Sequence, residues 1–130
     1  ENLETLNLRG SGLDSLGEIT CCKNLKVLNL SNNNLLDVSA LVALEELREV
    51  DLSSNTLDHL PDENPFGDSL VSLDLHSNKL EYLPDYLFTY PDLSKIDLRG
   101  KQLYNYNKRG LKTAFGEGVK VLKSPNCQCD

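Results

Sequence analysis

The chain has 130 residues, of which 39% are hydrophobic and 25% are charged. This length accommodates one domain, and the apolar runs are far shorter than the roughly 20 residues that a membrane-spanning helix needs. The net charge of −7 argues against nucleic acid as the main partner, because phosphate binding depends on clustered lysine and arginine. Leucine fills 27 positions, whereas methionine and tryptophan are absent. A core built from one aliphatic residue type indicates internal repetition.

One pattern of leucines recurs five times along the chain, with starts that lie 22 or 23 residues apart. A unit of this length cannot bury its own leucines, so neighbouring units must stack into one continuous core. The five units begin at Leu3, Leu25, Leu47, Leu70 and Leu93.

Each unit is predicted to contain a short strand followed by a return segment. The alternation Leu28-Asn29-Leu30 is typical of a strand with one buried face. After it, Leu35, Val38 and Leu41 recur every three residues, which favours 3₁₀ or short helical turns. The predicted fold class is therefore α/β: a short curved parallel sheet on the concave face of a solenoid, with 3₁₀ or helical returns on the convex face.

The pattern L-x-x-L-x-L-x-x-N-x-L covers nearly all of the chain, which therefore resembles the leucine-rich repeat proteins. Repeats one and two are similar to the short SDS22-like subclass, whereas Leu60-Pro61 and Leu83-Pro84 begin returns similar to those of extracellular repeat proteins. The resemblance divides the chain into five repeats over residues 1–115 and a degenerate sixth strand with the start of a C-terminal cysteine flank over residues 116–130.

The sixth strand is expected in a unit that begins near residue 116. Val119 and Val121 would take the strand positions that Leu6 and Leu8 hold in repeat one. In this register Lys120 lies on the exposed strand face, and Ser124 falls in the column of the asparagines.

That column consists of Asn33, Asn55 and Asn78, which are expected to turn inward and satisfy backbone groups of adjoining turns. Ser11 and Lys101 break the column. Because a lysine cannot be fully buried without a partner, we expect the stack to loosen or open at repeat five.

Repeat five also has a different return, which is predicted to contain a short helix at about residues 106–115. Asn105 or Asn107 can cap this helix, and Gly116 can end it. The apolar residues of its buried face are Leu111, Ala114 and Phe115.

Four cysteines fall into two pairs at opposite ends of the chain. The run Ser124-Pro125-Asn126-Cys127-Gln128-Cys129 resembles the start of the cysteine-rich C-terminal flank of extracellular leucine-rich repeat proteins, which implies that Cys127 and Cys129 form disulfides outside the cell. Cys21 and Cys22 lie four strand spacings away, roughly 20 Å, which is too far for a bridge or a shared zinc site. Cys22 is expected to be buried. An exposed Cys21 would suggest an intermolecular disulfide in a secreted protein, whereas a reduced Cys21-Cys22 pair favours the cytoplasm.

No set of residues converges on enzyme chemistry, so we expect no catalytic site, cofactor or metal. His59 and His76 fall on different parts of the repeat and are not expected to share a metal ion.

The polar residues between the leucines are predicted to line the exposed face of the sheet, where they either contact a protein or peptide ligand or are merely solvated. Double replacement of Asp74 and His76 by alanine is expected to weaken binding without changing the melting temperature. The predicted ligand-binding residues are Arg9, Asn29, Ser31, Asp51, Ser53, Asp74, His76, Asp97 and Arg99.

The resemblance implies a protein-recognition module, as an ectodomain fragment of a receptor, adhesion or innate immune recognition protein; the alternative is an intracellular SDS22-like scaffold or regulatory subunit. Residues 101–130 carry a net charge of +4 and residues 1–100 a net charge of −11, a polarity that suits either a separate partner or head-to-tail self-association through an end. All five tyrosines lie in repeats four and five, where they either form an interface or cover the return path.

Overall fold

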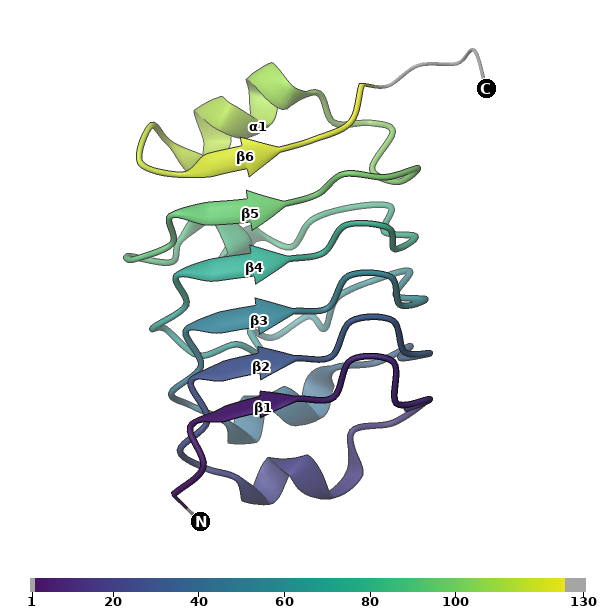
Figure 1. Cartoon of the computed structure of the whole chain (residues 1–130). Helices are drawn as coiled ribbons and strands as arrows, with labels where there is room; N and C mark the ends of the chain where they lie inside the picture. The colour runs from purple at the N-terminus through teal and green to yellow at the C-terminus, as the bar shows by residue number, and fades with distance from the viewer. Residues whose placement is uncertain (1, 126–130) are drawn as a thin grey trace.

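The computed structural model describes residues 2–125 and shows six strands stacked side by side, with the return segments behind them (Figure 1). Each strand pairs in parallel with its neighbours in sequence, so the sheet order is β1-β2-β3-β4-β5-β6. The predicted α/β solenoid is therefore confirmed. The strands are β1 (Thr5–Asn7), β2 (Val27–Asn29), β3 (Glu49–Asp51), β4 (Ser72–Asp74), β5 (Lys95–Asp97) and β6 (Lys120–Leu122).

The register of the last strand differs from the prediction. Val121, and not Val119, is paired with Ile96 and so takes the position that Leu6 holds in β1. Lys120 is therefore paired with Lys95, and Leu122 takes the polar column position that we predicted for Lys120. In the same register Ser124 lies two residues before the position equivalent to Asn33, and not in the asparagine column as predicted. The cause is a return in repeat five that is two residues longer than those of repeats three and four, because it contains an α-helix.

The returns of repeats one, two and four contain the predicted 3₁₀ turns: η1 (Gly17–Cys21), η2 (Ser39–Ala43) and η3 (Asp85–Phe88). Repeat five instead forms α1 (Lys108–Phe115). The Asn107 side chain caps this helix by accepting a hydrogen bond from the backbone N of Gly110 at 2.7 Å. Leu111 and Phe115 are buried beneath α1, whereas Ala114 is exposed, contrary to the prediction.

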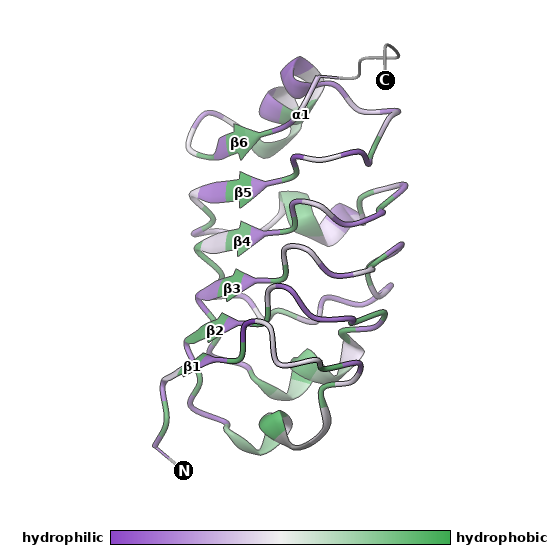
Figure 2. Ribbon diagram, turned by 45° about the vertical axis from the view of Figure 1, so that its right-hand side comes forward, coloured by the Kyte–Doolittle hydropathy of each residue, from purple (hydrophilic) through white to green (hydrophobic). Residues whose placement is uncertain are grey.

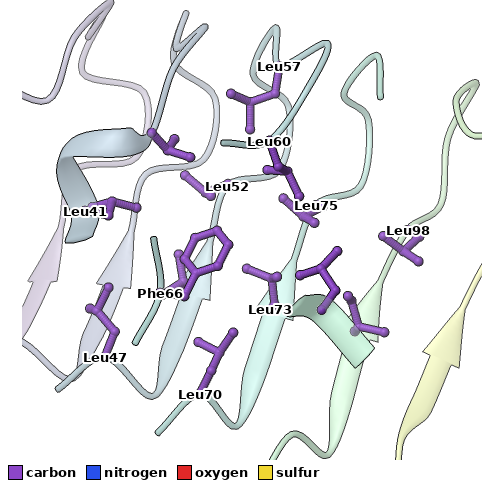
Figure 3. Close-up of a cluster of buried hydrophobic side chains, with 14 of the residues drawn as sticks. Leu41, Leu47, Leu52, Leu57, Leu60, Phe66, Leu70, Leu73, Leu75 and Leu98 are labelled. Atoms are coloured by element: carbon purple, nitrogen blue, oxygen red, sulfur yellow. The ribbon is translucent and has the colours of Figure 1, made fainter. Parts of the chain in front are cut away.

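The core is a column of leucines that runs the length of the solenoid between the sheet and the returns (Figure 3). Phe66, on the return of repeat three, is its largest fully buried side chain and packs among the leucines of repeats two to four. At the first coil the burial is incomplete, since Leu6, Leu8 and Leu13 are only half-buried and Leu3 is 41% exposed.

The inward asparagines connect each repeat to the one before it. The Oδ1 atom of Asn55 accepts a hydrogen bond from the backbone N of Leu35 at 3.0 Å, and its Nδ2 donates to the carbonyl of Leu30 at 3.0 Å. Asn33 and Asn78 make the equivalent bonds one repeat earlier and one repeat later. Since no strand ladder reaches these backbone groups, the amides supply their partners.

Repeat five does not loosen, because Gln102 takes over the role of the missing asparagine. Its Oε1 accepts a hydrogen bond from the backbone N of Leu80 at 3.0 Å, and its Nε2 donates to the carbonyl of Leu75 at 2.9 Å. Gln102 lies one position later than the column requires, and its additional methylene makes up the distance. Lys101 is exposed, and Leu103 returns to the leucine column by adopting a φ of +57°.

Candidate protein-binding surface

Three columns of side chains stand on the concave face of the sheet. One is the column of Asn29, Asp51 and Asp74, and a second begins two residues later in each repeat. The third column, two residues earlier, is absent from our sequence prediction, although the same period-two alternation places its residues on this face. It consists of Thr5, Val27, Glu49, Ser72, Lys95 and Lys120.

Side chains of these columns line a hollow of about 230 Å³ that spans β2 to β5. Its lining includes the acidic residues Glu49, Asp51 and Asp74 and, from β5, the basic residue Lys95. In Figure 2 each of these strands carries hydrophilic colour next to hydrophobic colour, as expected for a sheet with one buried and one open face.

The middle column also shapes the backbone. The Oδ1 atoms of Asn29, Asp51 and Asp74 each accept a hydrogen bond from the backbone N two residues further on, at 2.9, 2.9 and 3.0 Å. Asp97 does the same for the backbone N of Arg99 at 3.1 Å. This is the Asx-turn geometry, so these side chains help to turn the chain at the end of each strand.

Three of the predicted ligand-binding residues are not accessible. Ser31 and Ser53 are 0% and 3% exposed, and their hydroxyls donate hydrogen bonds to Asn29 and Asp51 at 2.7 and 2.6 Å. Asp97 is only 2% exposed. The prediction that these residues form part of an open surface is wrong, because the short serine side chains fold back onto Asn29 and Asp51 and because Arg99 covers Asp97. Of the other predicted residues, Asn29, Asp51, Asp74 and His76 are half-buried, and Arg9 and Arg99 are exposed.

Arg99 covers the buried carboxylate of Asp97 in a bidentate ion pair. Its Nε donates to Oδ1 at 3.0 Å and its Nη2 donates to Oδ2 at 2.7 Å. Burial pushes the pKa of Asp97 upward, but the hydrogen bonds and charge of Arg99 outweigh this effect and leave the pKa below its ordinary value. The pair is thus a stabilised structural unit at the rim of the surface.

Asp74 shows the opposite behaviour. Burial raises its pKa, and the neighbouring carboxylates of Asp51 and Asp97 raise it further, against the lowering effect of the hydrogen bond and charge of His76. The His76 Nε2 atom lies 3.9 Å from Asp74 Oδ1, at the outer limit of an ion pair. The centre of the concave face therefore holds more negative charge than its own residues neutralise.

Asp74, His76 and Asp97 bring ligand-type atoms within 4.8 Å of one another, a proximity that our sequence analysis missed because the residues come from adjacent strands. Both carboxylate oxygens of Asp97 already accept hydrogen bonds from Arg99. A guanidinium in this position competes with a metal ion for the same oxygens, so the arrangement is better described as a charge network than as a cation site.

Three of the five tyrosines in repeats four and five form hydrogen bonds to neighbouring coils, and the other two are exposed. The hydroxyl of Tyr86 donates to the carbonyl of Pro61 at 2.8 Å, and that of Tyr90 donates to Asn64 Oδ1, so both cover the return path of repeat three. Tyr106 accepts a hydrogen bond from the backbone N of Leu83 at 2.9 Å. Tyr82 and Tyr104 are exposed by 47% and 62%.

Of the cysteines, Cys21 is exposed and Cys22 is half-buried, and both are free thiols. Cys127 and Cys129, the predicted half-cystines, lie outside the described residues. None of the helices within residues 2–125 has the length and apolar character needed to span a bilayer.

These features define a class: a solenoid of short stacked repeats with a polar, accessible sheet face. The family model described as "Leucine Rich repeats (2 copies)" matches residues 1–43 and 23–62, and that described as "Leucine rich repeat" matches residues 45–103. The chain belongs to the leucine-rich repeat family. Such domains generally mediate protein–protein interaction and are typically non-enzymatic.

Among solved structures, the chain is similar to internalin C2 from Listeria monocytogenes, with 21% sequence identity and a TM-score of 0.75. The match covers 94% of this chain and 52% of the internalin chain, so the chain spans about half the length of that protein. At this identity the likeness supports the fold alone. A search of curated proteins finds no match.

Proposed function

We propose that the chain is a non-enzymatic recognition module that binds a folded protein or a peptide on its concave face. The observation that carries this proposal is the hollow across β2 to β5, which is lined by the carboxylates Asp51 and Asp74. Within the described part of the chain, neither carboxylate forms an ion pair with a lysine or an arginine. Burial is the main cause of the raised pKa of Asp74, and repulsion from Asp51 and Asp97 adds to it. A partner that supplies a cationic side chain here would offset both effects.

The composition of the surface favours a polypeptide partner. Carboxylates, an amide, a hydroxyl and Lys95 all line the hollow, which suits the mixed donors and acceptors of a protein surface. The lining of the hollow contains no aromatic residue, so the large aromatic anchors that dominate many tight interfaces are missing on this side. We therefore expect moderate affinity.

The test compares two double variants of equal size in a partner capture followed by quantitative mass spectrometry. Asp74→Asn with His76→Gln changes the concave face and keeps an acceptor for the Asx turn. Asp62→Asn with Glu63→Gln changes exposed residues of the repeat-three return. Partners of the concave face are lost with the first pair and retained with the second, and neither pair lowers the melting temperature. If both pairs retain every captured partner, the concave-face proposal is wrong.

We further propose that the chain acts outside the cell, as part of the ectodomain of a receptor, adhesion or innate immune recognition protein. The support is the resemblance of residues 124–129 to the start of an extracellular cysteine flank. Thiols are counted under denaturing conditions, before and after reduction, in the natively prepared parent protein. Cys127 and Cys129 should react only after reduction, and free thiols at these positions would refute the assignment.

An intracellular SDS22-like scaffold or regulatory subunit is the second candidate. The exposed free thiol of Cys21 favours it, since such thiols are unusual in oxidising compartments. The same thiol count decides between the two, because an intracellular protein keeps all four cysteines reduced.

A further inference from the structure

The charge of the solenoid reverses along its axis. Residues 2–93 contain five basic and sixteen acidic residues, a net charge of −11. Residues 94–125 contain eight basic and two acidic residues, a net charge of +6. The reversal occurs at the start of the coil that contains β5, so the C-terminal end of the stack carries an electrostatic character opposite to that of the rest.

Much of the positive charge lies in what we call the basic cluster: Lys108, Arg109 and Lys112 of α1 and Lys120 of β6. All four side chains are exposed. α1 and β6 lie against each other at one end of the stack (Figure 1). The helix and the strand therefore present these cations on one end of the molecule.

Two hollows connect the members of the basic cluster. One, of about 750 Å³, is lined by Lys108, Arg109 and Lys112. The other, of about 440 Å³, is lined by Lys108, Lys112 and Lys120. Because both lysines of α1 border both hollows, the cations converge on one continuous indented surface. Glu117 is the one acidic residue that lines either hollow.

The fold places these charges together without balancing them. Within residues 2–125, no member of the basic cluster takes part in an ion pair. Lys120 lies directly opposite Lys95 in the neighbouring strand, and Lys108 and Lys112 are four residues apart on one helix. Like charges in either relation repel each other. A ligand with several negative charges would remove this repulsion.

We propose that the basic cluster is a second docking surface, and that its occupant is an acidic segment of a partner protein with several aspartate or glutamate side chains. Charge complementarity supplies the attraction. The walls of the second hollow include Val119 and Leu122, both half-buried, which fit the aliphatic stems of such side chains.

Two other polyanions fit less well. Single-stranded nucleic acid is bound through aromatic platforms as well as cations, and no aromatic residue lines either hollow. An anionic membrane surface is bound by cations next to inserted apolar side chains, and the large exposed apolar residues of the described chain lie elsewhere. These are Leu3, Leu36, Val42, Tyr82 and Tyr104.

The test uses the full chain and a fluorescein-labelled hexaglutamate peptide, with hexaglutamine as the neutral control. Fluorescence anisotropy should show binding of hexaglutamate that weakens with added salt, and no binding of hexaglutamine. Lys112→Gln with Lys120→Gln should weaken hexaglutamate binding by about three- to tenfold, as expected for the loss of two exposed ion pairs. The matched control, Lys23→Gln with Lys79→Gln, removes the same charge from exposed positions in other repeats and should change binding less than twofold.

Each alternative result overturns the proposal. Absence of hexaglutamate binding would show that the basic cluster does not take up an acidic segment. Equal weakening by the two pairs of substitutions would show that only net charge matters. Tighter binding of oligothymidylate or of phosphatidylserine vesicles than of hexaglutamate would assign the surface to another partner. Self-association in sedimentation that the Lys112 and Lys120 substitutions abolish would make a second copy the occupant. Asp74→Asn with His76→Gln should leave hexaglutamate binding unchanged, which keeps this test separate from that of the concave face.

Discussion

The replacement Gln102→Asn tests whether repeat five is held closed by the length of one side chain. Asparagine is the residue that performs this role in repeats two to four, so a comparison of sequences alone would rate the change as favourable. The structure predicts the reverse. From position 102 a side chain shorter by one methylene cannot reach the backbone N of Leu80 and the carbonyl of Leu75, which Gln102 contacts at 3.0 and 2.9 Å.

The expected loss follows from these two contacts. Loss of the first contact leaves the buried backbone N of Leu80 without a partner, at about 1–3 kcal/mol. The carbonyl of Leu75 still accepts a hydrogen bond from Asn78 Nδ2 at 3.1 Å, so loss of the second contact costs only the about 0.5–1.5 kcal/mol of an ordinary hydrogen bond. Together the two losses amount to about 2–4 kcal/mol of unfolding free energy. For a chain of this size a loss of 1 kcal/mol lowers the melting temperature by roughly 4 °C. We therefore expect a decrease of about 8–16 °C.

Urea and thermal unfolding followed by circular dichroism measure this loss, with Gln102→Ala as the reference for complete removal of the amide. Gln102→Asn should fall close to Gln102→Ala. Amide hydrogen exchange should report the site directly, because the N–H of Leu80 loses protection whereas that of Leu57, held by Asn78 at 3.1 Å, keeps it. An asparagine variant as stable as the wild type would show that the turn simply shifts its register, and would refute the reasoning.

Three further predictions concern charge and backbone conformation. Asp74→Asn should raise stability at pH 7 by less than about 1 kcal/mol. Because the folded-state pKa of Asp74 is raised, ionisation of its carboxyl costs the wild type stability as the pH rises above about 3.8, so the stability of the variant relative to the wild type should increase between pH 3 and pH 7 in melting curves. Arg99→Ala should lower the melting temperature more at pH 7 than at pH 3, since the depressed pKa of Asp97 means that its stabilising contribution disappears on acidification. Gly100→Ala should cost about 2 kcal/mol or more in urea unfolding, because φ is +116° and the new Cβ would meet backbone of the preceding repeat at 2.9 Å. Gly12→Ala, with φ of +72° and no atom within 4 Å, should cost only about 1 kcal/mol.

Much of this fold can be predicted from the leucines because the repeat imposes one geometry on every coil. Once Leu28 and Leu30 face inward, the strand, its parallel partners and the inward turn of Asn33 follow from the pleat and from the need to satisfy backbone groups. The 3₁₀ returns follow in the same way from the three-residue spacing of apolar positions in repeats one and two.

The prediction failed where a repeat departs from the common length. Gln102 stands one position away from the asparagine column, and only side-chain reach in three dimensions shows that it completes the column. The longer return that contains α1 shifts β6 by two residues, so that Lys123 takes the position that Leu98 holds in repeat five. The apolar pattern of Val119 and Val121 favours the other register, which is why the prediction failed here. The burial of Ser31 and Ser53 was missed for a different reason, since a column of small polar residues does not indicate that their side chains fold back onto Asn29 and Asp51.

The three concave columns differ in how freely their chemistry can vary. Residues of the middle column must accept a hydrogen bond from the following turn, and from repeat one to repeat five this column contains only asparagine and aspartate. The column that contains Val27, Glu49 and Lys95 makes no such bond and spans apolar, acidic and basic side chains. Selectivity for a ligand is therefore expected to come mainly from this earlier column, while the aspartates of the middle column supply a fixed acidic background. A partner that lies across the sheet would meet excess negative charge over β3 and β4 and positive charge from β5 onward, and this polarity would set its direction.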